Sequence, residues 1–159
     1  MKSRVRAREE LPELDVVANY VRENGLRWTA QRKLIVEVAF GHHDHFRAEE
    51  LLEMCRKIDR GVSRATVYRT LAMLEAAGFV EGLDTGDGGR KFEHVLGHEH
   101  HDHMVCTECG AIHEFRDDEL ERRQELAAAR FGFEITNHSL KLFGRCKDCK
   151  RSGRRRDGR

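Results

Sequence analysis

Apolar positions recur with a helical period through the first half of the chain. In the segment 13–24 they share one face, between Pro12, which can open a helix, and Gly25, which can end it. The members of this face are Leu14, Val17, Ala18 and Val21. The pattern predicts an amphipathic helix that buries these side chains.

Three further helices are predicted before residue 78. Thr29 is a suitable N-cap for a helix that ends before Gly41, and a third helix is expected over residues 47–58. Gly61 then turns the chain, and Ser63 can cap a fourth helix, SRATVYRTLAMLEAAG. The expected apolar stripes are Leu34, Ile35 and Val38 in the second helix and Leu51, Leu52 and Cys55 in the third. Cys55 is thus interpreted as a small core residue.

The pattern changes after Gly78. FVEGL and RKFEHV are strand-like and flank DTGDGG, a strong hairpin signal. Helices followed by a β-hairpin predict a winged helix, a variant of the helix-turn-helix DNA-binding fold.

The fourth helix has two unlike faces. Val67, Leu71 and Leu74 should pack on the core. The other side carries small and cationic or aromatic residues, namely Arg64, Ala65, Tyr68, Arg69, Ala72 and Ala76. Small side chains would let the backbone approach a groove, where Tyr68 and Arg69 could reach base edges or phosphates. The alternative is an ordinary solvated face.

A second, smaller unit is expected over residues 97–149. Strand-like runs (MV, AIHEF and EITNHSLKLFG) enclose one helix that begins at Asp117 and Asp118 and ends at Gly132. Its face of Leu120, Gln124, Ala127 and Phe131 is expected to point to the core. The predicted fold class is α+β, and so small a unit would need metal or dimerisation to hold.

Composition excludes several classes of protein. The 159 residues are 39% hydrophobic and 36% charged, with no run long enough to span a membrane and no apolar leader segment, so a cytosolic protein is expected. Five cysteines in that compartment favour metal binding or thiol chemistry over disulfides. The net charge is only +1, but both ends of the chain are basic and are interpreted as disordered, solubilising tails or as a non-specific attraction for phosphates.

Four of the cysteines form a CxxC…CxxC pair: Cys106, Cys109, Cys146 and Cys149. Four thiolates at these spacings can surround one Zn²⁺ tetrahedrally, and Gly110 relieves the first turn. Because all four positions are sulfur, the site should be structural; a redox dithiol switch is the rival interpretation. Chelation should then cost the protein its fold and its dimer.

Six of the ten histidines lie between residues 94 and 113. In a strand, alternate residues share a face, so His101 and His103 should point one way and His100 and Asp102 the other. Each set suits Fe²⁺, Mn²⁺, Co²⁺ or Zn²⁺ better than the thiolate site does. Glu93 and Glu114 could join the first set, and Glu121 and His138 the second; periodicity permits these groupings without proving them. Isolated surface histidines are the alternative, and His98 is interpreted in that way.

The sequence resembles the ferric uptake regulator (Fur) superfamily over roughly residues 14–149. The resemblance rests, in order, on LRWTAQRKLIVEV, AEELL, SRATVYRTLAMLEAAGFV, KFEHV, HHDHMVCTECGAIHEF and TNHSLKLFGRCKDC. It implies a cytoplasmic, homodimeric, metal-dependent transcriptional regulator, usually a repressor. The implied domains are a winged helix (1–94), a hinge (95–99), a dimerisation domain (100–149) and a basic tail (150–159).

The resemblance also implies the sites. The structural Zn²⁺ falls on the four CxxC cysteines, and a further metal position falls on His100, Asp102, Glu121 and His138. The regulatory metal, Fe²⁺ with Mn²⁺, Co²⁺ or Zn²⁺ as substitutes, falls on His45, Glu93, His101, His103 and Glu114. Among His42, His43 and His45, the place before AEELL favours His45. DNA contacts fall on Arg27, Arg32, Tyr68 and Arg69, and Arg64 is predicted to join them from its place in the first turn of the same helix.

Together these features predict that Fe²⁺ couples the two domains, so that a dimer binds a pseudo-palindromic operator. The resemblance implies that such operators lie at iron-acquisition genes. Pairing of dimers into tetramers is left open. Within the superfamily, glutamate at 93 and 114 favours iron sensing over peroxide sensing, in which aspartate is typical, and zinc or manganese sensing ranks third. Outside it, a metal hydrolase would explain the His/Glu cluster but not the winged helix. A metal-storage protein would not explain Arg64, Tyr68 and Arg69. No enzymatic role and no membrane partner are therefore expected.

Overall fold

The computed structural model describes residues 12–85 and 89–152. It divides the chain into two compact units. The first holds the described residues up to Leu83 together with Arg90–His98, and the second holds those of Asp84–Gly89 and those from Glu99 onward. Among the described residues, no helix is long and apolar enough to cross a membrane.

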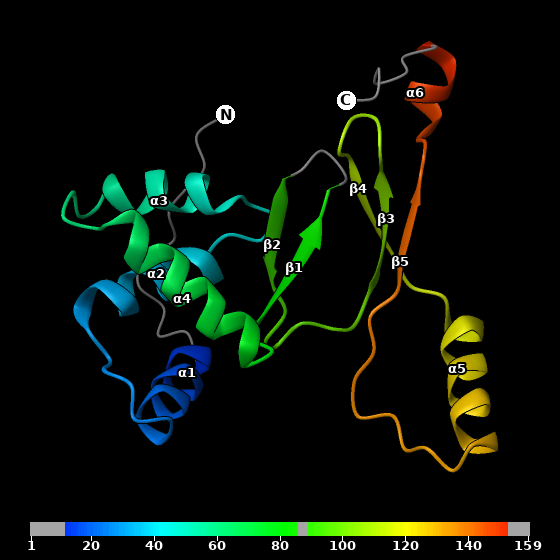
Figure 1. The fold of residues 1–159 in the computed structure, drawn as a ribbon, viewed down its shortest axis with the longest axis horizontal. Coiled ribbons are helices and arrows are strands. Elements are labelled where there is room, and N and C mark those ends of the chain that lie inside the picture. Colours follow the sequence, from blue (N-terminus) through cyan, green and yellow to red (C-terminus); the bar gives the residue numbers. More distant parts are fainter. Residues whose placement is uncertain (1–11, 86–88, 153–159) are drawn as a thin grey trace. The chain divides into compact units, whose positions relative to one another are not determined.

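The first unit is a helical bundle followed by a two-stranded hairpin (Figure 1). Its elements are α1 (Pro12–Glu23), α2 (Ala30–Phe40), α3 (Ala48–Arg56), α4 (Arg64–Ala76), β1 (Val80–Asp84) and β2 (Arg90–His94). This is the winged helix that the apolar periodicity predicts. The solved relatives described below share the fold, which confirms the α+β class.

The predicted helix starts are confirmed at the hydrogen-bond level. The Thr29 hydroxyl accepts from the Arg32 N–H at 3.2 Å, and the Ser63 hydroxyl accepts from the Thr66 N–H at 3.1 Å. Each cap satisfies a backbone donor that the first helical turn leaves unpaired, an effect of about 1 kcal/mol. Gly25, with a φ of 69°, adopts the left-handed conformation that ends α1 as expected.

The core lies where the predicted stripes of α1, α3 and α4 meet. Val17, Leu51, Val67 and Leu74 are fully buried, and so is Cys55, whose pKa burial raises to about 11. The stripe predicted for α2 is only partly right. Ile35 is buried, but the buried set continues through Val36, Ala39 and Phe40, while Leu34 and Val38 are half-buried. The reason is that α2 contacts α1, α3 and α4 and so is covered on more than one side.

Two contacts fix the hairpin to the helices. Phe46, just before α3, forms an antiparallel bridge with Phe92 of β2 through N···O distances of 2.9 and 2.7 Å. Arg90 of β2 forms an ion pair with Glu75 near the end of α4. The pair lies over Gly82, where an added Cβ would sit 2.6 Å from the Arg90 guanidinium and from the Glu75 carboxylate. A side chain at position 82 would therefore require the end of the Arg90 or Glu75 side chain to move.

The second unit is built on a three-stranded sheet. Its elements are β3 (Asp102–Cys106), β4 (Ile112–Phe115), α5 (Asp118–Arg130), β5 (Lys141–Gly144) and α6 (Lys147–Ser152). The strand order is β4-β3-β5, with β3 antiparallel to β4 and parallel to β5. Asp117 caps α5 by accepting from the N–H groups of Glu119 and Leu120.

The expectation that one face of α5 points to the core is wrong. None of its residues is buried: Leu120 and Gln124 are half-buried, Ala127 is exposed, and Phe131, just after the helix, is 82% exposed. Figure 1 shows α5 beyond the sheet rather than over its face. An amphipathic pattern indicates that one face of a helix packs against other residues. It does not tell whether those residues belong to the same chain or to another.

The basic ends fall mostly outside the described residues. This holds for Lys2, Arg4, Arg6 and Arg8, and for Arg154, Arg155, Arg156 and Arg159. The tail expected from residue 150 begins inside α6, because Lys150, Arg151 and Ser152 are helical.

Candidate metal centres and nucleic-acid surface

The four cysteines of the CxxC pair converge at one edge of the second unit. Parallel pairing of β3 with β5 aligns Cys106 with Gly144, so that both CxxC turns follow strands ending at the same edge. The four Sγ atoms all lie within 4.8 Å of one another. Gly110, with a φ of 70°, allows the turn that follows Cys109. The sequence-predicted set is therefore brought together complete.

The geometry and chemistry of the four sulfurs fit Zn²⁺. Thiolates about 2.3 Å from a tetrahedral zinc lie about 3.8 Å apart, and the Sγ atoms of Cys109 and Cys146 are 3.8 Å apart. Burial raises the pKa of Cys106, but hydrogen bonds from the backbone N–H groups of Cys146, Cys109 and Glu108 lower it to about 6. With Cys106 a thiolate, the Cys146 thiol raises the pKa of Cys149 to about 12. A divalent cation would stabilise all four thiolates at once.

The regulatory residues expected in the first unit form a close pair. Because the Phe46–Phe92 bridge is antiparallel, it places His45, which precedes Phe46, beside Glu93, which follows Phe92. His45 Nε2 lies 3.3 Å from Glu93 Oε2. Glu93 is buried. The other two histidines of that loop face elsewhere: His42 contacts the Phe46 ring and His43 the His98 ring.

The regulatory residues expected in the second unit form another cluster. His103 of β3 lies directly opposite Glu114 of β4 in the antiparallel register. His101 shares the face of His103, with ring centroids 4.9 Å apart, and its Nε2 lies 3.9 Å from Glu114 Oε2. His103 is 1% exposed, so that this cluster offers a buried imidazole beside a carboxylate and a second imidazole.

The other face of the same strand start carries the third set. His100, Asp102, Glu121 and His138 each place a ligand atom within 4.8 Å of the others. The His100 ring lies 4.1 Å from the His138 ring, and His138 Nε2 is 3.0 Å from Glu121 Oε2. His100 Nε2 is 3.3 Å from Asp102 Oδ1. The split of HHDH into two faces follows strand alternation, as the sequence predicts.

Asp102 supports the fit of this third set to a cation. It is 1% exposed, and neither of its carboxylate oxygens makes a hydrogen bond among the described residues. A buried carboxylate in this state is costly unless a positive charge compensates it. Two imidazoles and two carboxylates suit a borderline or hard divalent cation.

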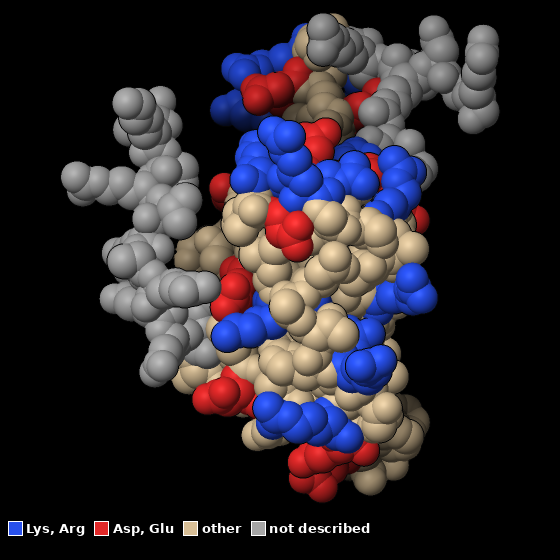
Figure 2. Space-filling view, turned by 90° about the vertical axis from the view of Figure 1, so that its left-hand side faces the viewer, with Lys and Arg blue, Asp and Glu red and all other residues tan. Residues whose placement is uncertain are grey.

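The residues expected to contact DNA lie on the exposed side of α4 and near the start of α2. Arg64, Tyr68 and Arg69 are all exposed, as are Ala65, Ala72 and Ala76. Arg27 is exposed and its carbonyl accepts from the Arg32 guanidinium. Seen from the helical side, Lys and Arg side chains lie in several groups, interrupted by a few acidic ones and by uncharged surface (Figure 2).

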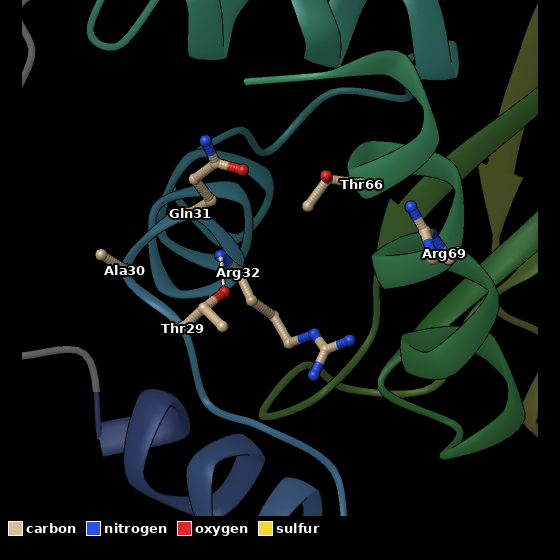
Figure 3. A pocket seen from close by; sticks show the side chains of 6 residues that line it. All are labelled: Thr29, Ala30, Gln31, Arg32, Thr66 and Arg69. Carbon is tan, nitrogen blue, oxygen red and sulfur yellow. Dashed lines mark hydrogen bonds between the residues drawn. The ribbon is translucent and has the colours of Figure 1, made fainter. Parts of the chain in front are cut away.

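Two of these arginines line one groove. The groove has a volume of about 450 Å³ and is lined by Thr29, Ala30, Gln31, Arg32, Thr66 and Arg69. Figure 3 shows Arg32 extending from the first turn of α2 into the space between α2 and α4. Two guanidinium groups beside a helix N-terminus make this groove suited to an anionic ligand.

Sequence reasoning missed three residues of this surface. Gln31 and Thr66 line the groove, and Glu49 of α3 contacts both Arg64 and Tyr68. A glutamate in the first turn of a helix is common because it complements the helix dipole, so its position carries no signal of a tertiary contact.

The fold and the sites therefore define a winged-helix protein whose described residues include three clusters of metal-binding side chains. The Ferric uptake regulator family model matches residues 23–143, and the chain belongs to this family. Its members are metal-responsive transcriptional regulators, and this chain is one of them.

Individual relatives are similar over most of their length. The ferric uptake regulation protein of Campylobacter jejuni is 39% identical over 131 residues, covering 81% of this chain and 83% of the relative. The ferric uptake regulator of Helicobacter pylori, whose structure is described as having three functional metal binding sites, superposes with a TM-score of 0.73 at 35% identity, covering 86% and 91%. The structure of the ferric uptake regulator from Pseudomonas aeruginosa with manganese superposes with a TM-score of 0.72 at 34% sequence identity. The match covers 82% of this chain and 97% of that one.

Proposed function

We propose that the protein is an iron-responsive repressor that binds operator DNA as a homodimer when Fe²⁺ occupies the regulatory ligands. The observation that carries this proposal is the division of those ligands between the two units. His45 and Glu93 belong to the winged helix, and His101, His103 and Glu114 belong to the sheet unit. One cation that takes ligands from both would tie the DNA-binding part to the rest of the chain.

The residues have separate roles in this proposal. The Cys106, Cys109, Cys146 and Cys149 site holds a structural Zn²⁺. His100, Asp102, Glu121 and His138 form a further metal site. Arg64, Tyr68 and Arg69 meet the major groove, while Arg27 and Arg32 bind phosphates. Residues 1–94, 95–99 and 100–149 act as DNA-binding domain, hinge and dimerisation domain.

The dimer is supported by the apolar surface of the second unit. Seven large hydrophobic side chains among the described residues there are 38% exposed or more: Met104, Leu126, Phe131, Phe133, Ile135, Leu142 and Phe143. Surface of this kind on a unit of some fifty residues is typical of an interface between subunits. A two-fold dimer would present paired α4 helices to a pseudo-palindromic operator.

The test is a titration of operator affinity against the metal. Chelator-treated protein is loaded with Fe²⁺, Mn²⁺ or Zn²⁺ under anaerobic conditions, and binding to a duplex selected from a random library is measured by fluorescence anisotropy. We expect tight binding with Fe²⁺ or Mn²⁺, reversed by chelation. His101→Ala should abolish this dependence and retain the zinc and the dimer. Equal affinity with and without metal would refute the coupling.

The same titration separates iron sensing from the alternatives. Iron-loaded protein that loses DNA binding irreversibly after peroxide would be a peroxide sensor. Protein that responds to Zn²⁺ or Mn²⁺ but not to Fe²⁺ would sense one of those metals instead. Glu93 and Glu114 as the carboxylate ligands favour the iron response.

A further inference from the structure

A carboxylate on α3 holds two side chains of the DNA-facing surface. Glu49 Oε2 lies 3.0 Å from Arg64 Nη2, and the Tyr68 hydroxyl donates to Glu49 Oε1 at 2.8 Å. The Arg64 and Glu49 side chains are 68% and 43% exposed, so this is a surface contact and not a core support. Arg64 and Tyr68 are one helical turn apart, so a single carboxylate reaches both.

The Glu49 carboxylate offers Arg64 and Tyr68 the kind of acceptor that a DNA phosphate would offer them. Guanidinium and phenol groups are typical donors to phosphate oxygens, and a carboxylate presents the same negative oxygens at similar distances. The hydrogen bond to Glu49 raises the pKa of Tyr68, which agrees with a hydroxyl that donates to an anion. An exposed ion pair of this kind is weak, so it can bias competition for Arg64 without preventing release.

The effect of Glu49 on binding should differ between random DNA and operator DNA. Binding to random duplex is almost wholly an attraction of cations to phosphates, and neutralising Arg64 removes one cation from it. Docking on an operator depends in addition on side chains held in a fixed geometry. The hydrogen bond to Glu49 orients the Tyr68 side chain before DNA arrives.

We infer that Glu49 is a specificity-determining residue, which withholds Arg64 from the phosphates of random DNA while it positions Tyr68 on the α4 surface. This inference rests on the proposed DNA binding through α4. In this role the Glu49 carboxylate disfavours binding to random DNA more than it disfavours binding to the operator.

Glu49→Gln is the informative variant, because the glutamine oxygen still accepts from Tyr68 but no longer neutralises Arg64. Metal-loaded protein is titrated by anisotropy against the selected operator and against a random duplex of equal length, over a range of KCl. We expect random-duplex affinity to rise about three-fold, and its salt slope to steepen by about 0.9, the effect of one more phosphate contact. Operator affinity should change less, which lowers the specificity ratio.

Two controls isolate the contact. Glu53→Gln makes the same charge change on the exposed side of α3 and should not alter the salt slope or the ratio. In an Arg64→Gln background, Glu49→Gln should have no further effect on random DNA. The inference would be overturned if Glu49→Gln and Glu53→Gln changed random-duplex affinity and its salt slope equally. It would also be overturned if Glu49→Gln still raised random-duplex affinity in the Arg64→Gln background.

A readout without DNA separates this inference from the proposed function. Ultraviolet titration follows the phenols of Tyr20 and Tyr68, the two tyrosines of the chain. Glu49→Ala should lower the pKa of Tyr68, and an unchanged titration would refute the contact itself. If the titration shifts but the wild type binds neither duplex with any metal, the proposed DNA binding fails, and the specificity role fails with it.

Discussion

The Sγ atoms of Cys109 and Cys146 lie 3.8 Å apart although 37 positions separate them in the sequence. The parallel pairing of β3 with β5 causes this approach, and the sulfur atoms are already at the spacing that tetrahedral zinc requires. Cys146→Ser should therefore lower the zinc content by one ion per chain. Since binding at a structural zinc site contributes on the order of 10 kcal/mol, the second unit should unfold, while the core of the first remains.

Zinc content by atomic emission and secondary structure by circular dichroism measure this outcome. The matched control is Cys55→Ala, which removes a buried thiol from the helical core at a cost of about 1 kcal/mol and should keep the zinc. A Cys146→Ser protein that keeps its zinc and its full structure would show that the four thiolates do not form a structural site.

Asp102 should oppose stability without metal and support it with metal. Its carboxylate is buried, neither oxygen makes a hydrogen bond among the described residues, and His100 Nε2 at 3.3 Å compensates the charge only when that ring is protonated, so Asp102→Asn removes a buried charge that is costly without metal. We expect the metal-free variant to be more stable than wild type by about 1 kcal/mol and to lose the stabilisation that added Mn²⁺ or Zn²⁺ gives. Thermal unfolding with and without metal tests this. A variant stabilised by metal as strongly as wild type would exclude Asp102 as a ligand.

Phe131 should be a determinant of the dimer. It is 82% exposed in the chain, and a glutamate there would place a charge in the proposed apolar interface. Phe131→Glu should give monomers in multi-angle light scattering. Ile58→Glu is the matched control, since Ile58 is 68% exposed but belongs to the first unit. Dimers from the Phe131 variant, or monomers from both, would place the interface elsewhere.

His94 should make the first unit less stable in mild acid. Its ring is stacked on Phe40, with centroids 4.0 Å apart, and burial lowers its pKa from 6.5 to about 4. Between these values the unfolded chain binds a proton that the folded chain does not, so stability falls as the pH falls from 6.5 towards 4. The full shift corresponds to about 3 kcal/mol.

Urea unfolding of metal-free protein at a series of pH values measures this dependence. His94→Phe keeps the stacked ring and removes the titrating group, so its stability should vary less over the same interval. The interpretation fails if wild type and variant lose stability in parallel.

The sequence predicts the features that depend on neighbours along the chain. Strand alternation assigns His101 and His103 to one face and His100 and Asp102 to the other, and capping residues locate the helix starts at Thr29 and Ser63. These features are local, because backbone geometry alone fixes them.

Features that depend on distant contacts could not be predicted in this way. The amphipathic pattern of α5 marks Phe131 as a residue to be covered, yet this chain leaves it exposed. The hydrogen bond from Tyr68 to Glu49 joins two helices and leaves no periodic signal. The same holds for Arg32 and Arg69, which line one groove from different helices.

The ion pair of Arg90 with Glu75 over Gly82 has a consequence for protein engineering. Two of these three residues lie in the wing, and the third lies on α4. A chimera that exchanges residues 80–94 with the wing of another protein would leave Glu75 behind without Arg90, and a side chain at position 82 would require the Glu75 carboxylate to move. The transferable module is therefore the wing together with the last turn of α4, and grafts should be cut before Glu75 rather than at Gly78.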